Sequence, residues 1–200
     1  MLEALTGLGL ASAAGLNAYI PMLAMGLLSR FTDLLSVPPG WAWLENEWVM
    51  VILGVLLVVD MIADKIPAVD SINDIIQTVV RPASGGIVFG SGSASETIAV
   101  TDPESFVSSG QWVPIVTGIV IALLVHLAKA AIRPIANAAT FGLAAPVLST
   151  VEDGASIGLV ALAIIVPVLV VFALIGLIVL AVVYLRRRRR RIAAASPRPA

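Results

Sequence analysis

Residues 112–134 read WVPIVTGIVIALLVHLAKAAIRP, an apolar stretch that ends in basic side chains and an Arg-Pro pair. About 20 consecutive apolar residues suffice for a helix to cross a bilayer, so the part from Trp112 to about Lys129 predicts a transmembrane helix. His126, Lys129 and Arg133 follow at spacings of three and four, which places them on one helical face. The sequence therefore predicts a membrane helix with a basic face near its end.

The Arg-Pro pair belongs to a longer phrase that occurs twice. Residues 81–90 read RPASGGIVFG, and residues 133–142 read RPIANAATFG, so Arg-Pro is followed at the same offset by Phe-Gly. A span that begins at a tryptophan, at 48 or at 112, precedes each copy. We interpret the chain as two repeat units at about 48–100 and 112–151, with flanking spans at 5–28 and 157–185.

Composition decides the class of protein. Of 200 residues, 59% are hydrophobic and only 12% are charged, and the mean hydropathy is +1.02. These values lie far from those of soluble domains. The chain is therefore expected to be an all-α polytopic membrane protein of about six transmembrane or partly re-entrant helices. Residues 1–185 would form a single membrane domain. The absence of cysteine and the single histidine argue against disulfides, metal sites and haem, so no metal or cofactor is expected.

The C-terminal tail carries the clearest orientation signal. Arg186 to Arg191 form an unbroken basic run directly after the last apolar span. Such runs stay on the cytoplasmic side, so the tail at 186–200 is predicted to be cytoplasmic. The run could also bind anionic lipid or nucleic acid. We favour the orientation signal, with the bilayer and not nucleic acid as the partner.

The first apolar segment, 5–28, is rich in glycine and alanine, which allows close helix packing. Asn17, Tyr19 and Pro21 bring polar groups and a helix breaker to its middle, so a kink that faces protein or water is expected. Glu3 stands where a signal peptide needs positive charge, which favours a retained span.

A tryptophan-rich connector at 29–47 resembles an outward-facing interfacial loop, and a second span follows at 48–65. Beyond it, apolar residues recur at helical spacing from 69 to 80, on the face opposite Asp70, Asn73, Asp74 and Gln77. The pattern predicts an interfacial amphipathic helix. Because its polar face is acidic, packing against the protein's own core is favoured over binding to anionic lipid.

Two weakly apolar segments, 82–101 and 134–151, leave the topology open. If both cross the membrane, the chain has six spans with both ends inside. The cytoplasmic side then holds Lys65, Arg81, Lys129 and Arg133, and the outer side holds Asp102, Glu104, Glu152 and Asp153. If both are re-entrant, four spans remain and the two units are inverted, as in many transporters. The positive-inside rule favours the six-span topology, because the re-entrant alternative would place Lys129 and Arg133 on the outer side.

Asp60 and Asp64 lie four residues apart on one face of the second span. Buried carboxylates need partners or must take up a proton, so this acidic face could meet the basic face of the second unit. The charges at 64, 65, 129 and 133 could instead be interfacial, with long side chains that reach the headgroups. Asp60 and His126 lie deeper, where ionisable groups tend to mark pathways.

Each Arg-Pro junction favours the start of a new helix, because proline suits the first turn and disfavours a helical residue before it. A helix N-terminus beside Arg81 and another beside Arg133 would form two corners that attract anions. The alternative is that Arg81 and Arg133 are basic only because cytoplasmic ends of membrane helices are enriched in Lys and Arg.

The chain resembles a known family in three places: GLNAYIP at 15–21, ADKIP at 63–67 followed by Asp70, and Arg81-Pro82. The family is a bacterial membrane family catalogued only as domain of unknown function 4126. The resemblance covers roughly Leu2 to Leu185. It implies a membrane location and supports the choice of motifs, but it implies no activity.

The leading hypothesis is a small inner-membrane transporter or channel-like protein, with homo-oligomerisation expected. It would move a small anionic solute, an ion or a lipid headgroup through a polar site between the repeats. The predicted pathway residues are Asn17, Tyr19, Asp60, Asp64, Lys65, Arg81, Glu96, His126, Lys129 and Arg133. The alternatives are a non-transporting scaffold or accessory subunit and, third, an intramembrane enzyme, for which no catalytic motif is present.

Overall fold

The computed structural model describes residues 2–93, 110, 112–140, 144–176, 179 and 182. Within these residues the regular elements are all helices, which confirms the all-α part of the predicted fold class. They are α1 (Leu2–Leu16), α2 (Tyr19–Phe31), η1 (Pro39–Glu45), α3 (Glu47–Ala63), α4 (Pro67–Gly92), α6 (Trp112–Thr140) and α7 (Ala144–Ile165), followed by a short apolar helix, Pro167–Gly176.

By length and composition, two helical stretches could cross a membrane: Trp112–Pro134 and Ala145–Ile165. A third candidate is η1 together with α3, which meet at a bend of 63°. The described residues therefore provide two or three candidate spans. The count of six and the repeat relationship stay predictions.

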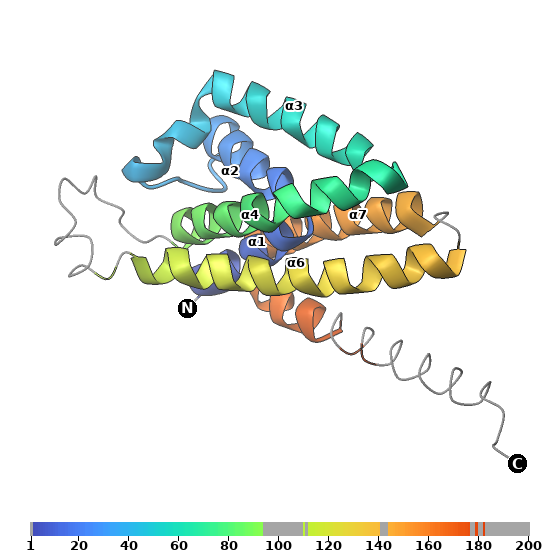
Figure 1. The fold of residues 1–200 in the computed structure, drawn as a ribbon. Coiled ribbons are helices and arrows are strands. Elements are labelled where there is room, and N and C mark those ends of the chain that lie inside the picture. The colour runs from blue at the N-terminus through green and yellow to red at the C-terminus, as the bar shows by residue number, and fades with distance from the viewer. Residues whose placement is uncertain are drawn as a thin grey trace, which may run out of the picture.

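Helix α1 lies at the centre of the bundle and packs against α4, α6 and α7, while α2 and α3 lie together along one side (Figure 1). Glycines allow the closest approaches. A Cβ added at Gly15 would overlap Val125 on α6, and one added at Gly118 would overlap the backbone carbonyl of Gly85 on α4. The expected close packing of the first segment is confirmed. The contact of Gly118 with Gly85 also brings α4 and α6 close together.

The first apolar segment is broken, as expected, between α1 and α2. Asn17 is 1% exposed, and its Oδ1 accepts hydrogen bonds from the backbone N–H groups of Tyr19 (3.0 Å) and Ile20 (3.3 Å). These amides begin α2 and have no helical partner of their own. The break therefore faces protein, and Asn17 satisfies backbone groups that would otherwise be unpaired.

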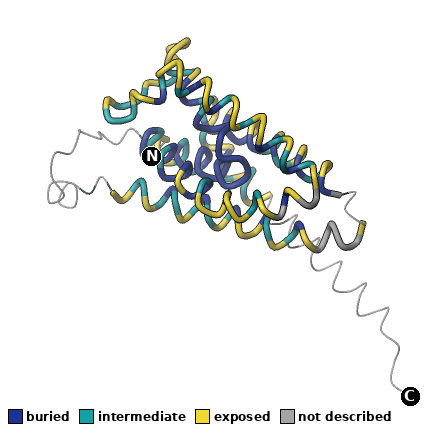
Figure 2. The backbone as a smooth tube through the Cα atoms, turned by 45° about the horizontal axis from the view of Figure 1, so that its top comes forward, coloured by how far each residue is buried: buried dark blue, intermediate teal, exposed yellow. Residues whose placement is uncertain are grey.

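The bundle buries polar faces and exposes apolar ones. Buried backbone gathers at the centre, and exposed stretches follow the outer helices (Figure 2). On α4, Ile75 and Val79 are each 73% exposed, whereas Asp70 and Gln77 are 2% and 1% exposed. The predicted inward packing of this acidic face is confirmed. An apolar outer surface around a charged interior is the arrangement that lipid favours.

The prediction of a helix N-terminus at each Arg-Pro junction is wrong. Pro82 lies inside α4 and Pro134 lies inside α6. Proline inside a helix costs a hydrogen bond, but neighbouring helices can compensate in a tightly packed bundle. The close contact of Gly85 with Gly118 holds α4 and α6 together just beyond Pro82, so local preference yields to packing.

The second weak segment, 134–151, does not form a helix of its own. Its first residues continue α6 to Thr140, and α7 begins at Ala144 and runs back along the bundle (Figure 1). Glu152 Oε2 lies 2.6 Å from Arg133 Nη2. The six-span alternative would place Glu152 on the opposite side from Arg133; the two side chains instead meet, because α7 runs antiparallel to α6.

Some predictions fall on residues outside the described ranges. They concern Glu96, Asp102, Glu104, the second Phe-Gly pair at 141–142, and the basic run from Arg186 to Arg191.

Candidate functional site

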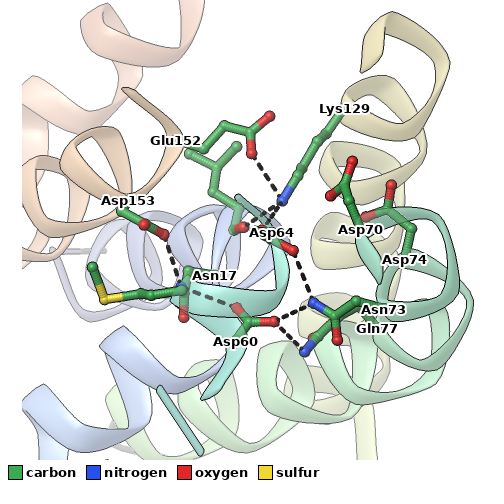
Figure 3. Close-up of polar contacts among 12 residues, drawn as sticks. Asn17, Asp60, Asp64, Asp70, Asn73, Asp74, Gln77, Lys129, Glu152 and Asp153 are labelled. Atoms are coloured by element: carbon green, nitrogen blue, oxygen red, sulfur yellow. Dashed lines mark hydrogen bonds and ion pairs between the residues drawn. The ribbon is translucent and has the colours of Figure 1, made fainter. Parts of the chain in front are cut away.

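Charged and amide side chains from five segments converge at the centre of the bundle (Figure 3). We call this set the charge cluster. It comprises Asn17 at the α1–α2 break, Asp60 and Asp64 at the end of α3, Asp70, Asn73, Asp74, Gln77 and Arg81 on α4, His126, Lys129 and Arg133 on α6, and Glu152 and Asp153 on α7.

Asp64 is the meeting point of the cations. Its Oδ2 lies 3.3 Å from Lys129 Nζ, 3.0 Å from Arg133 Nη2 and 3.6 Å from Arg81 Nη2. All four side chains are at most 3% exposed. The acidic face of the second span does meet the basic face of α6. Because these charges are buried, each depends on its partners rather than on water.

Arg133 binds further carboxylates from two helices. Its Nη1 pairs with Asp70 and lies 4.0 Å from Asp74 Oδ1, and its Nη2 lies 2.6 Å from Glu152 Oε2. Glu152 also lies 2.9 Å from Lys129 Nζ. One guanidinium thus ties the end of α3 to α4 and α7.

Asp60 lies in a different environment, made of amides. It accepts hydrogen bonds from Asn17 Nδ2 (3.3 Å), Asn73 Nδ2 (2.7 Å) and Gln77 Nε2 (2.7 Å). Asn17 Nδ2 also donates to Asp153 Oδ1 at 2.9 Å. Among the described residues, neither Asp60 nor Asp153 forms an ion pair. The cluster therefore has a paired half around Asp64 and an amide half around Asp60.

His126 is 1% exposed and joins α6 to α4. Its Nδ1 lies 3.3 Å from Arg81 Nη1, and its Nε2 lies 3.0 Å from Thr78 Oγ1. A guanidinium can only donate, so Nδ1 must accept and Nε2 carries the hydrogen. The Thr78 hydroxyl can accept that hydrogen because its own proton goes to the backbone carbonyl of Asp74. This network assigns the neutral Nε2–H tautomer to His126.

Most of the predicted pathway residues come together in the cluster. Tyr19 is buried next to Asn17, whereas Lys65 is half-buried and donates from Nζ to the carbonyl of Met61 at 3.0 Å. Lys65 therefore contributes no contact to the cluster that the structure records. The prediction for Glu96 lies outside the described residues.

Sequence reasoning missed two groups in this site. Asp70, Asn73, Asp74 and Gln77 were recognised as a polar helical face but not as site residues, and Glu152 and Asp153 were placed only by the six-span alternative, on the outer side. The usable signal was the apolar face on the other side of the 69–80 helix. If that face meets lipid, the acidic face must turn toward the cations.

The fold and the cluster together define a class: a helical protein with a charged interior and with two helices long and apolar enough to cross a membrane. The family model described as a domain of unknown function (DUF4126) matches residues 4–187, so the chain belongs to this family, as the motifs suggested. Comparisons with curated proteins and with solved structures found no match. Among the described residues, no group of three or more His, Cys, Asp or Glu side chains is arranged to hold a metal ion.

Proposed function

We propose that this protein is a small transporter or channel-like protein of the bacterial inner membrane, and that an ion passes through the charge cluster. The observation that carries the proposal is the burial of Arg81, Lys129, Arg133, Asp60 and Asp64 in a bundle whose outer surface is apolar. Ionisable groups are expensive at membrane depth, and where they occur they tend to mark ion or proton pathways.

The charges favour a proton or small cation as the ion. Four buried carboxylates, at positions 60, 64, 70 and 153, and two partly buried ones, at 74 and 152, surround three permanent cations, because His126 is neutral in its hydrogen-bond network. A buried excess of negative charge must be offset by bound protons or cations. An anionic solute or lipid headgroup, the alternative, would have to displace carboxylates that already pair with Arg133.

A scaffold or accessory subunit is the second candidate, and one observation favours it. Arg133 contacts Asp64, Asp70 and Glu152, and these ion pairs could serve only to hold α3, α4, α6 and α7 together. Nothing in the contacts of His126 favours an intramembrane enzyme. Its partners in the described region are Thr78 and Arg81 rather than a nucleophile.

Flux measurements separate the two candidates. Purified protein would be reconstituted into liposomes that contain a proton-, sodium- or potassium-sensitive dye, and the response of each dye to an imposed gradient of its own ion would be recorded. We expect the wild type to dissipate at least one gradient and Asp64→Asn to reduce that rate at least tenfold. Asp33→Asn, which changes an exposed acid outside the cluster, is the matched control. Absence of wild-type flux for every ion would support the scaffold.

A further inference from the structure

We propose that Asp60 and Asp153, joined by the side-chain amide of Asn17, form a pair that binds one exchangeable proton. The inference deepens the proposed function and rests on it, because it identifies the proton as the ion that the cluster carries. Asn17 Nδ2 lies 3.3 Å from Asp60 Oδ2 and 2.9 Å from Asp153 Oδ1 (Figure 3). The acids are 2% and 6% exposed, so water cannot stabilise two charges there.

The polar contacts of the pair are unequal. Asp60 accepts from three amides, whereas Asp153 accepts only from Asn17, and its Oδ2 is buried without a hydrogen-bond partner in the described part of the chain. Each carboxylate can accept one of the two Asn17 N–H hydrogens, but neither acid pairs with a cation in the described residues, and two such buried carboxylates disfavour double ionisation. One proton removes that conflict. Because Asn17 joins the two carboxylates, the proton is assigned to the pair rather than to one residue.

The surroundings of the pair favour a proton over a metal cation. Asp64 adds negative charge from the end of α3, Arg81 and Lys129 add positive charge from α4 and α6, and Tyr19 faces Asp60 from α2. The amides of Asn17, Asn73 and Gln77 turn their N–H groups toward the carboxylates. A cation would need oxygens in those positions. These donors stabilise the single negative charge that remains when the pair of acids holds one proton.

Asn73 connects Asp60, one acid of the proton-binding pair, to Asp64, which forms the ion pairs. Asn73 Nδ2 donates to both Asp60 Oδ1 (2.7 Å) and Asp64 Oδ1 (2.8 Å). Uptake of a proton by the pair weakens the charge that Asn73 and Gln77 contact, and Asn73 can then shift toward Asp64. Protonation at the α1–α2 break is thereby linked to the carboxylate that holds Arg81, Lys129 and Arg133.

Infrared difference spectroscopy tests the pair without measuring flux. Purified full-length protein in detergent would be titrated with acid, and the C=O stretch of protonated carboxyl groups would be followed. We expect a band that Asp60→Asn and Asp153→Asn both remove and that Asp33→Asn retains. If Asp153→Asn does not fold, Asp153→Glu keeps a carboxyl and should retain the band at a shifted frequency.

Two results would overturn the inference: a band that survives both Asn substitutions, or no band at any pH at which the protein stays folded. A band that sodium abolishes at constant pH would assign the site to a metal cation and would also overturn it. Because this readout needs no transport, loss of flux with an intact band contradicts only the proposed function. Flux without the band contradicts only the proton pair.

Discussion

Removal of the Asp64 carboxylate should destabilise the folded protein, and the structure indicates by how much. Breaking a buried ion pair by removing one partner costs about 3–5 kcal/mol. After Asp64→Asn, Arg133 keeps Asp70 and Glu152, and Lys129 keeps Glu152, but Arg81 loses the carboxylate that pairs with it. We therefore expect a loss near the lower limit, about 3 kcal/mol, which reflects mainly one unpaired guanidinium.

A double-mutant cycle tests this assignment to Arg81. Unfolding free energies would be measured in mixed micelles by titration with a denaturing detergent for Asp64→Asn, Arg81→Met and the double variant. Since the second substitution removes the orphaned charge, the double variant should be at least about 1 kcal/mol more stable than the sum of the single losses predicts. Asp33→Asn should change stability by less than about 0.5 kcal/mol. Additive losses within error would refute the reasoning.

Three further predictions concern the membrane and the packing. Val55 lies on the exposed face of α3, and Val55→Lys should reduce the fraction of protein that inserts into membranes, whereas Val55→Leu should leave that fraction unchanged. Equal insertion of the two variants would mean that this face does not meet lipid. Gly118→Ala should cost about 1–3 kcal/mol because the new Cβ meets a backbone carbonyl of α4, whereas Gly54→Ala, with open space around it, should be neutral in the same unfolding assay. In the cysteine-free background, an impermeant thiol reagent should label Leu34→Cys in intact cells but Ala195→Cys only after permeabilisation; the reverse pattern would invert the proposed orientation.

Helical spacing predicted the central contact of the cluster. Asp60 and Asp64 share one face, and His126, Lys129 and Arg133 share another, so their attraction could be proposed without coordinates. The break at Asn17 could also be predicted from the sequence, because a polar side chain and a nearby proline disrupt an apolar helix. Both predictions depend on local periodicity and on the cost of burying charge.

Tertiary contacts determine two features that local sequence rules did not predict: helix continuity at the prolines and the position of Glu152. Local rules start a helix at Pro82 and at Pro134, yet α4 and α6 continue through both prolines, and near Pro82 the contact of Gly85 with Gly118 holds α4 against α6. The six-span alternative assigned Glu152 to the outer side, because it counted 134–151 as a complete crossing. Its partner Arg133 lies 19 residues away across a hairpin, and only the hairpin reveals the pair.

The two halves of the cluster have different physical roles. Around Asp64, three cations and several acids neutralise one another, so this half resists a change in charge. Around Asp60, amide donors replace cations, and an amide stabilises a carboxylate without fixing its charge as firmly as a guanidinium does. A site that must gain and lose an ion needs such a weakly held charge beside a firmly held one. Asn73, which touches Asp60 and Asp64, lies at the boundary between them, and the α1–α2 break places Asn17 at the other end of the same hydrogen-bonded chain.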